Sequence, residues 1–460
     1  MSQTAFASLN LSPELLKNLS TLGYEVMTPI QAQSLPAILA GKDVIGQGKT
    51  GSGKTAAFGL GLLEKLEVKR FQIQTLVLCP TRELADQVAQ EIRRLARAIH
   101  NIKVLTLCGG VPFGPQIGSL EHGAHIVVGT PGRVEEHLRK GTLQLRDLSM
   151  LVLDEADRML DMGFQDALDA IIEKMPERRQ TLLFSATYPN KIQSIAERIM
   201  SEPVIVKVAE GHDSSTISQH FFKVVDDEQR YQALRLLLLH HRPESTVVFC
   251  NTKKEAQRVA DELECDGFSA LALHGDLEQR ERDQALIRFA NKSISILVAT
   301  DVAARGLDID ALDAVINYHI AHDAEVHVHR IGRTGRAGNQ GIACSLFSHK
   351  EGYKVALLEG DVDPIKDHEP LPPLSVLDKP AMRPAMVTLQ IDGGKRQKVR
   401  AGDILGALTG DNGIPGTAVG KIKIFNSWAY VAINRNEIDV ALHKLENGKI
   451  KGRSFRIRQI

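Results

Sequence analysis

The chain is 460 residues long, 43% hydrophobic and 24% charged, with equal numbers of basic and acidic residues. This length predicts two or three domains, and the composition is typical of a globular protein with enough apolar residues for several cores. The sequence has no apolar run of about 18 residues, which argues against a membrane span. It also has no basic and apolar signal at its N-terminus, so we expect a cytoplasmic protein.

The charge is unevenly distributed along the chain. From Met382 to the C-terminus there are 14 basic and 6 acidic residues, so this tail carries a net charge of +8 and the preceding chain −8. A basic tail on an acidic body predicts a polyanionic partner at one end. The cysteines form no C-x-x-C pair, which indicates neither a zinc site nor a disulfide framework. They are Cys79, Cys108, Cys250, Cys265 and Cys344.

A glycine-rich phosphate loop is indicated by Gly48–Thr55, which fits the pattern G-x-x-x-x-G-K-T. The glycines let several backbone N–H groups face one phosphate chain. In this pattern Lys54 reaches the β and γ phosphates, and the Thr55 hydroxyl binds Mg²⁺. A strand over Asp43–Ile45 and a helix over Lys54–Leu66 would place the phosphates at a helix N-terminus. The alternative is a flexible turn rich in glycine and serine.

Short apolar runs alternate with amphipathic helices through roughly the first 350 residues. One such helix is expected over Arg82–Ile99, because its apolar residues fall on one face. Unbroken apolar strands that alternate with helices predict a parallel sheet covered on both faces. In the first part of the chain the predicted strands are Thr75–Cys79, Val104–Leu107, His125–Val128, Met150–Leu153, Thr181–Phe184 and Val204–Val208.

The strand Met150–Leu153 runs directly into the acidic sequence Asp154-Glu155-Ala156-Asp157. An apolar strand that ends in acids is where a nucleotide hydrolase holds its metal ion. We expect Asp154 to bind Mg²⁺, directly or through water, and Glu155 to polarise the attacking water. A solvated acidic turn is the alternative for such a sequence on its own.

The alternation restarts after residues 211–215, which divides this part of the chain into α/β domains at 1–210 and 211–360. The second domain's predicted strands are Thr246–Cys250, Ala270–His274, Ile294–Ala299, Ala314–Asn317 and Ile342–Phe347. Six prolines make residues 361–384 a semi-extended linker.

Residues 385–460 form a third domain with the order strand, helix, strand, strand, helix, strand. This order is ferredoxin-like, the α+β plan of RNA-recognition domains. The predicted strands are Met386–Ile391, Gly420–Phe425, Ala429–Ile433 and Ser454–Ile457, and the helices are Gly402–Leu408 and Asn436–Leu445.

From Phe6 to Phe347 these motifs, in unbroken order, resemble those of the DEAD-box RNA helicases of superfamily 2. The resemblance implies two tandem RecA-like domains that use ATP and Mg²⁺ to unwind RNA locally. It also implies that Gln31 bonds the adenine edge, that Tyr24 stacks on the base, and that Gly306 and Asp308 meet the ribose. The implied nucleotide-binding residues are Tyr24, Thr28, Gln31, Gly51, Ser52, Gly53, Lys54, Thr55, Gly306 and Asp308.

The same resemblance implies contacts to the RNA backbone from both α/β domains. In the first domain these segments follow predicted strands and offer hydroxyls, helix amides and a guanidinium, although T-P-G is also a common helix start. Asp157, Ser185, Thr187 and His329 are expected to couple the nucleotide state to the RNA. The implied RNA-facing residues are Pro80, Thr81, Arg82, Gly109, Gly110, Thr130, Pro131, Gly132, Arg133, Asn251, Thr252, Gln279, Arg282 and Thr300.

The segment His329–Arg336 implies two arginine fingers, Arg333 and Arg336, which act on the γ-phosphate from the facing domain. The implied catalytic set is Lys54, Asp154, Glu155, Arg333 and Arg336. The alternating His327 and His329 are an alternative metal site, but the sequence offers no third or fourth ligand nearby.

In the tail domain, Trp428 and Tyr430 lie two residues apart and therefore on one strand face, as aromatic residues that stack on bases must. The segment around them only partly fits the ribonucleoprotein pattern, because Asn426 replaces its basic first residue and Ile433 its aromatic last one. Both base stacking by Trp428 and its burial in the core remain open.

Several glycine- and lysine-rich segments of the tail resemble the RNA-binding domain of one bacterial branch of this family. That branch is stimulated by a hairpin of 23S ribosomal RNA, so the resemblance implies 23S rRNA and pre-50S particles as partners and a role in large-subunit assembly. Two alternatives stay open: a DNA-dependent ATPase of the same superfamily, and a non-enzymatic rRNA-binding scaffold. The intact catalytic set argues against the scaffold.

Overall fold

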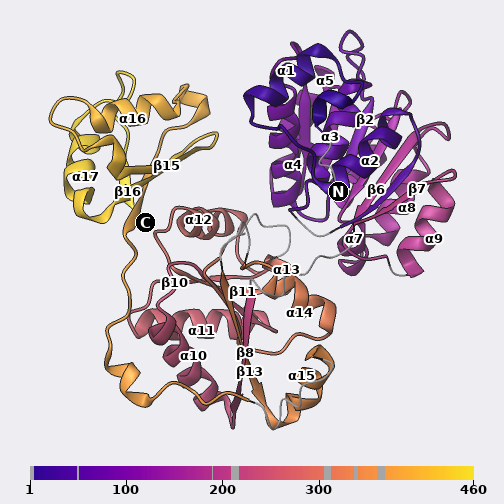
Figure 1. Ribbon diagram of the computed structural model, residues 1–460. Coiled ribbons are helices and arrows are strands. Elements are labelled where there is room, and N and C mark those ends of the chain that lie inside the picture. Colours follow the sequence, from indigo (N-terminus) through magenta and orange to yellow (C-terminus); the bar gives the residue numbers. More distant parts are fainter. Residues whose placement is uncertain are drawn as a thin grey trace. The chain divides into compact units, whose positions relative to one another are not determined.

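The structure is a computed structural model, and it describes residues 5–48, 51–188, 190–208, 217–304, 312–335, 340–359 and 368–460. The chain divides into two compact units, which we describe separately (Figure 1). The first comprises Met1–Gly211 with Gly306–Asp308, and the second His212–Arg305 with Ile309–Ile460.

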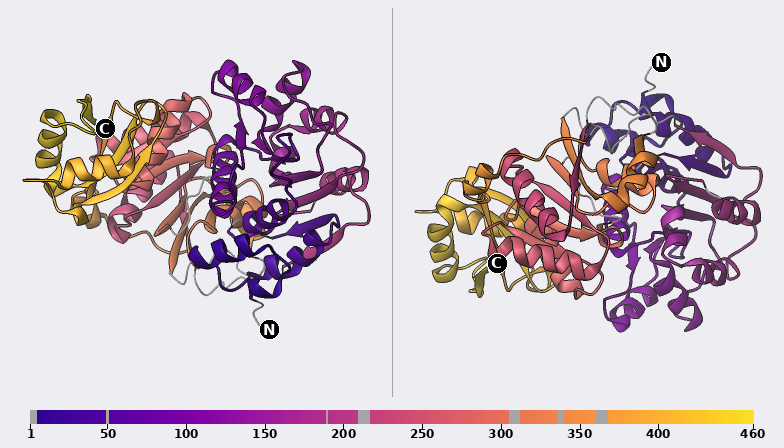
Figure 2. Two further views of the ribbon diagram at one scale, coloured as in Figure 1. Left: turned by 90° about the horizontal axis from the view of Figure 1, so that it is seen from above. Right: turned by 90° about the horizontal axis from the view of Figure 1, so that it is seen from below.

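The first unit contains a seven-stranded sheet in the order β3-β4-β2-β5-β6-β1-β7, and the strand pairings are parallel. Its strands are β1 Val44–Gln47, β2 Thr75–Leu78, β3 Val104–Leu107, β4 Ile126–Gly129, β5 Met150–Asp154, β6 Gln180–Ser185 and β7 Val204–Lys207. Helices flank these strands on both faces (Figure 2), which confirms the predicted parallel sheet covered on both sides.

The helices of the first unit follow the predicted strand–helix alternation. They are η1 Phe6–Ser8, α1 Pro13–Thr21, α2 Pro29–Leu39, α3 Lys54–Glu64, α4 Arg82–Leu95, α5 Phe113–Glu121, α6 Pro131–Arg139, α7 Ala156–Asp161, α8 Gln165–Ile172 and α9 Asn190–Ile199.

Helix α4 shows how the sequence determines these elements. Thr81 caps its N-terminus by accepting a hydrogen bond from the Leu84 N–H at 3.3 Å, and such caps contribute about 1 kcal/mol. Its apolar residues are buried against the sheet. The helix ends at Leu95 rather than at Ile99 as predicted, because the next residues tighten into turns, in which the Ile99 N–H bonds the Ala96 carbonyl at 2.8 Å.

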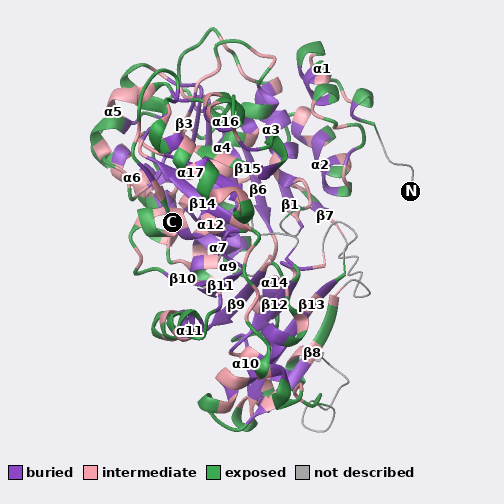
Figure 3. Ribbon diagram, turned by 90° about the vertical axis from the view of Figure 1, so that its left-hand side faces the viewer, coloured by how far each residue is buried: buried purple, intermediate pink, exposed green. Residues whose placement is uncertain are grey.

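The second unit contains a six-stranded parallel sheet in the order β10-β11-β9-β12-β13-β8. Its strands are β8 Ile217–Val224, β9 Thr246–Cys250, β10 Ala270–Leu273, β11 Ile296–Thr300, β12 Ala314–Asn317 and β13 Gly341–Ser348. Strand β8 is missing from the predicted set. It is partly exposed (Figure 3), and its residues Ser218, Gln219 and His220 are polar, so it lacks the unbroken apolar run by which the other strands are recognised.

The helices of this second sheet domain and of the segment that follows it are α10 Asp227–His241, α11 Lys253–Cys265, α12 Gln279–Ala290, α13 Asp301–Ala304, α14 Ala324–Ile331, η3 His349–Glu351, α15 Gly352–Glu359 and η4 Leu374–Asp378. No helix in the described part of the chain is both long and apolar enough to cross a membrane.

The tail has a four-stranded antiparallel sheet in the order β15-β16-β14-β17. Its elements are β14 Met386–Ile391, η5 Lys395–Gln397, α16 Ala401–Thr409, η6 Gly416–Ala418, β15 Val419–Ile424, β16 Ala429–Asn434, η7 Arg435–Glu437, α17 Ile438–Asn447 and β17 Ile457–Gln459. This confirms the predicted order of strands and helices. The last strand begins three residues later than predicted, at Ile457.

The described part of the proline-rich segment packs against the second sheet domain instead of lying free. Its short helix η4 buries Val376 in the same apolar cluster as α10 and β9. The Glu369 N–H donates to the Phe221 carbonyl of β8 at 2.9 Å, and Arg242 donates to the Pro380 carbonyl at 3.3 Å.

Candidate nucleotide-binding and RNA-binding sites

The phosphate loop connects β1 to α3, and its described residues have the conformation that the motif requires. Gly51 and Gly53 have φ values of +82° and +94°, which only glycine adopts easily. A Cβ on Gly53 would also collide with the side chains of Gln31 and Thr28. The buried Lys54 ammonium donates to the Gly48 carbonyl at 2.6 Å, so its charge is held inside the loop.

Gln31 reaches this loop from the N-terminus of α2. Its carbonyl accepts from the Thr28 N–H at 2.8 Å, and its amide nitrogen donates to the Gly53 carbonyl at 3.1 Å. Both polar groups of Gln31 therefore bond protein here, and its contact with an adenine stays a prediction. Tyr24 is partly exposed and donates to Glu91 at 2.9 Å; its stacking role also stays a prediction.

The acidic motif lies at the carboxyl end of β5. Asp154 is 3% exposed, and its Oδ1 has no hydrogen-bond partner among the described residues. Burial raises the pKa of Asp154 to about 7, while the nearby Lys54 charge lowers it. Among these residues Ser52 Oγ is also buried and unpaired. A buried carboxylate with an unpaired oxygen beside a phosphate loop fits Mg²⁺, which prefers oxygen ligands.

Glu155 adopts a left-handed backbone conformation with φ +54° at the start of α7. Such a conformation costs a non-glycine residue on the order of 1–3 kcal/mol and is often found at functional sites. Arg158 holds its carboxylate in an ion pair at 2.8 Å, with both side chains 5% exposed. The backbone strain and the ion pair fix the direction of this carboxylate.

Hydrogen bonds join Asp157 to the Ser185-Ala186-Thr187 segment. One carboxylate oxygen of Asp157 accepts from the Ala186 N–H at 3.2 Å, and from the Thr187 N–H and hydroxyl at 3.0 Å each. In return, the Asp157 N–H donates to Ser185 Oγ at 3.3 Å. The acidic motif is thereby tied to the end of β6, although the coupling role of these bonds stays a prediction.

The predicted RNA-facing segments of the first unit follow the neighbouring strands β3, β4 and β2. The glycine pair Gly109-Gly110 comes after β3, Thr130–Arg133 after β4 and Pro80–Arg82 after β2. Because carboxyl ends of parallel strands share one edge of the sheet, the fold brings these segments together. Arg133 bonds the Val111 carbonyl, Gln116 and Glu136, and its contact with RNA stays a prediction.

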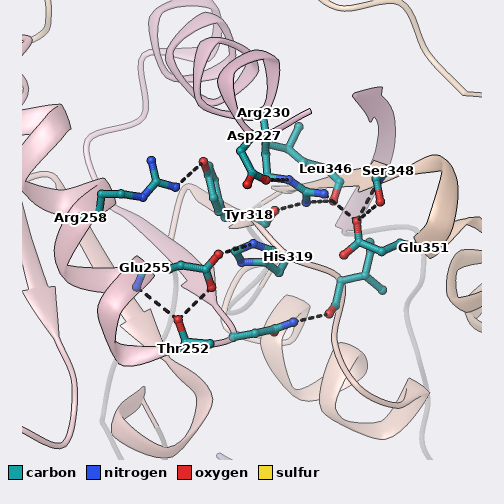
Figure 4. A network of polar contacts seen from close by, with 12 residues as sticks. Asp227, Arg230, Thr252, Glu255, Arg258, Tyr318, His319, Leu346, Ser348 and Glu351 are labelled. Atoms are coloured by element: carbon teal, nitrogen blue, oxygen red, sulfur yellow. Dashed lines mark hydrogen bonds and ion pairs between the residues drawn. The ribbon is translucent and has the colours of Figure 1, made fainter. Parts of the chain in front are cut away.

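In the second unit, Asn251 and Thr252 follow β9, Thr300 ends β11, and Gln279 and Arg282 lie in the first turn of α12. Thr252 caps α11, accepts from the Glu255 N–H and donates its hydroxyl to the Glu255 carboxylate at 2.9 Å. The same carboxylate lies 3.1 Å from His319 Nε2, a contact drawn in Figure 4. Burial lowers the pKa of His319.

Arg330 is a central residue of the second unit to which the sequence alone assigned no role. It is 2% exposed and forms a two-pronged ion pair with Asp301 at 2.6 and 2.7 Å. It also donates to Asn251 Oδ1 at 3.0 Å, to Asn317 Oδ1 at 3.2 Å and to the His319 carbonyl at 2.7 Å. The only sequence feature that could have pointed to Arg330 is its position in the segment His329–Arg336, which contains the predicted arginine fingers.

Of the predicted arginine fingers, Arg333 is described and buried, and its carbonyl accepts from the Leu312 N–H at 3.1 Å. Arg336, Gly306 and Asp308 lie outside the described residues. His329 lies in α14 and is partly buried. His327 bonds Gln219 at 3.1 Å, and burial lowers its pKa to about 4.

The tail's sheet face contacts α12. Arg280 lies over the Trp428 ring at 5.4 Å, and Tyr430 is fully buried. On β14, Thr388 forms hydrogen bonds with Asn291 at 3.1 Å and with Ser293 at 2.7 Å. Gln390 of the same strand forms one with Gln284 at 3.1 Å. Protein covers the Tyr430 ring, and half-buried Trp428 is part of the same contact. Base stacking by either residue stays a prediction.

The tail also exposes two basic loops. One runs through η5 to the start of α16, and the other lies between α17 and β17. The Lys451 ammonium donates to the Lys398 carbonyl at 2.9 Å, so the loops are neighbours. The exposed basic residues of these loops, here called the basic loop pair, are Lys395, Arg396, Lys398, Arg400, Lys449, Lys451, Arg453 and Arg456.

Two parallel α/β sheets, a phosphate loop and a strand that ends in buried acids define a RecA-like nucleotide hydrolase with tandem motor domains and an appended α+β domain. Residues 28–195 match the DEAD/DEAH box helicase model, residues 229–338 the helicase conserved C-terminal domain and residues 388–459 the DbpA RNA binding domain.

Similar proteins agree with this assignment. The chain is 54% identical to the ATP-dependent RNA helicase DbpA of Escherichia coli, over 99% of each chain. It is 46% identical to the DEAD-box ATP-dependent RNA helicase CshA of Geobacillus kaustophilus, over 76% of this chain and 74% of that protein. The solved structure of S. cerevisiae Dbp5 bound to RNA and ADP BeF3 superposes with a TM-score of 0.70 at 30% identity, covering 78% of this chain and 94% of that one. The chain belongs to the DEAD-box family of ATP-dependent RNA helicases.

Proposed function

We propose that this helicase separates short RNA duplexes in or beside 23S ribosomal RNA, in the cytoplasm, during assembly of the large ribosomal subunit. The observation that carries the proposal is the combination of a tandem motor with a tail that matches the DbpA RNA binding domain and exposes the basic loop pair. Clustered lysine and arginine residues bind nucleic acid mainly through its phosphates.

In the motor, the work on ATP is divided among several residues. Lys54 offers its ammonium to the phosphates, and the carboxylate of Glu155, held by Arg158, orients the attacking water. Asp154 and Thr55 would hold Mg²⁺, which when bound neutralises phosphate charge. Arg333 and Arg336 supply guanidinium groups to the transition state. Asp157 and Thr187 link the acidic motif to the end of β6, and we assign the coupling of nucleotide state to RNA binding to this link.

In the tail, RNA selection falls to the basic loop pair, because the sheet face is used by α12. The net charge of +8 after Met382 supports strong attraction to phosphates. The tail then anchors the motor close to its target, which raises the effective concentration of neighbouring duplexes at the motor.

The proposal is tested by ATPase rates with a 23S rRNA fragment, an unrelated RNA and a DNA of equal length. We expect the 23S fragment to give half-maximal stimulation at the lowest concentration. The variant Arg396→Glu/Arg453→Glu should remove this preference but leave the rate at saturating unrelated RNA unchanged, whereas the control Lys421→Glu, on the exposed edge strand β15, should retain the preference.

Two other outcomes would contradict the proposal. Equal stimulation by DNA would favour a DNA-dependent ATPase, and RNA binding without any hydrolysis would favour a scaffold. A control that removes the tail should end after Arg383 and not at Pro380. The Pro380 carbonyl accepts a hydrogen bond from Arg242, and Ala381 packs on the apolar core of the second sheet domain.

A further inference from the structure

A buried glutamine joins two of the segments to which an RNA contact is assigned. Gln116 lies on α5, is 8% exposed, and donates from Nε2 to the carbonyl of Cys108 at 3.1 Å. That carbonyl immediately precedes Gly109-Gly110. The Oε1 of the same side chain accepts from Arg133 Nη1 at 2.9 Å, so a single amide connects the loop after β3 with the segment after β4.

His137 fixes the direction of this amide. Its Nε2 lies 2.8 Å from Gln116 Oε1 and its Nδ1 lies 2.8 Å from the Thr142 hydroxyl. Because Oε1 carries no proton, Nε2 must be the donor. Burial lowers the pKa of His137 to about 4, so the ring is neutral near pH 7 and its Nδ1 accepts from Thr142. The ring also stacks on Phe113 at 4.0 Å and 16°.

Arg133 completes the connection from the other side. Besides Gln116, its Nη1 donates to the Val111 carbonyl at 3.1 Å, and its Nε pairs with Glu136 at 3.2 Å. The side chain is only 13% exposed. Cys108 and Val111, which flank the glycine pair, are therefore both bonded to one small group of side chains made by α5 and α6.

We propose that Gln116 is a positioning residue that holds Gly109-Gly110 and Thr130–Arg133 as one preorganised clamp for the RNA backbone. Gln116 itself does not touch RNA. The inference rests on the proposed RNA contacts of these two segments. A clamp that is rigid before binding avoids the entropy of ordering its backbone on the RNA, which is about 1–2 kcal/mol per residue.

The test is the RNA concentration that gives half-maximal ATPase stimulation in the full chain, together with the rate at saturating RNA and the affinity for ATP. Gln116→Leu keeps most of the volume but removes all three hydrogen bonds. It should raise the half-maximal RNA concentration about 5- to 30-fold, which is the ordering cost of one loosened residue. The saturated rate and ATP affinity should stay near those of the wild type.

Gln116→Glu is the second variant, in case Gln116→Leu fails to fold. It retains an acceptor for Arg133 and His137 but loses the donor to Cys108, so it should weaken RNA binding less than the leucine variant. Hydrogen–deuterium exchange at Gly109 and Gly110 should become faster in both. The control Ser119→Ala, on the same helix, removes only a hydroxyl that donates to the Pro115 carbonyl of its own turn at 2.9 Å, and should change none of these quantities.

One further variant separates this inference from the proposed RNA contact. A side chain at Gly109 meets nothing within 4 Å, so Gly109→Asp should fold and place a negative charge where phosphate is expected. Wild-type RNA affinity in Gly109→Asp would overturn the RNA contact itself. Weakened binding in Gly109→Asp with wild-type binding in both Gln116 variants would overturn only the positioning role.

Discussion

Replacing Arg330 by methionine should destabilise the second unit more than most single substitutions do. Methionine retains much of the volume but none of the donors. The substitution leaves Asp301 with 15% of its side chain exposed and without its partner. It also leaves acceptors on Asn251 and Asn317 and the His319 carbonyl without the arginine.

The magnitude follows from these contacts. Removing one partner of a buried ion pair costs about 3–5 kcal/mol, and each orphaned neutral acceptor costs about 1–3 kcal/mol if water cannot reach it. These terms overlap, so we expect a loss of about 4 kcal/mol, a large part of the roughly 5–15 kcal/mol that stabilises a domain. Asp301→Asn in the Arg330→Met background removes the uncompensated charge, and should recover on the order of 0.5–3 kcal/mol.

Trp428 makes this measurement specific to the second unit. It is the only tryptophan of the chain and lies in the tail beside Arg280 of α12. Urea unfolding followed by its fluorescence therefore reports the second unit, provided that the denaturant dependence is the same in all variants. A loss below about 1 kcal/mol for Arg330→Met, or strictly additive effects of the two substitutions, would refute the reasoning.

Four further predictions concern the first unit and the arginine motif. Lys54→Ala should abolish RNA-stimulated ATP hydrolysis with an unchanged melting temperature; near-normal turnover would show that the loop is not the phosphate cradle. Arg336→Ala should lower the hydrolysis rate about 10³–10⁵-fold with a much smaller loss of ATP affinity; a loss confined to affinity would exclude a finger. Thr187→Val removes one donor to Asp157 and should reduce unwinding more than hydrolysis in parallel assays. The pKa of His137 is about 4 in the fold and about 6.5 when unfolded, so stability should fall as the pH drops between these values, and His137→Gln should flatten this dependence.

The parts of the fold that follow from local sequence patterns were predictable. Apolar strands flanked by helices predicted the two parallel sheets. The order of strand and helix patterns in the tail predicted its sheet and its helices. Strand β8 was not predicted because Ser218, Gln219 and His220 in its first half are polar and not buried, so it has no unbroken apolar run. The end of α4 was placed too late because amphipathic spacing continues to Ile99 beyond the point where the backbone tightens.

The candidate site likewise has residues whose contacts could be predicted from the sequence and residues whose contacts could not. Contacts within a motif or between motifs of known chemistry, such as Asp157 with Thr187, were predictable because both partners carry recognisable residue types. Gln116 and Arg330 were not, since their roles come from partners that the fold brings together from different strands. A glutamine on an amphipathic helix and one arginine among several in a motif have no local pattern that marks them as buried.

The tail's sheet shows how one strand pattern is compatible with two different surfaces. In the structure, Thr388, Gln390 and Tyr430 lie on one face of β14 and β16, opposite the apolar core. An RNA platform and a polar protein interface both require such a face. Here α12 supplies matching amides and hydroxyls, so the sheet is used to hold the tail against the second motor domain. Helix α12 also carries Gln279 and Arg282 in its first turn. The tail is thereby attached to an element assigned to the motor's own RNA contacts, and its basic loop pair remains exposed for a separate RNA segment.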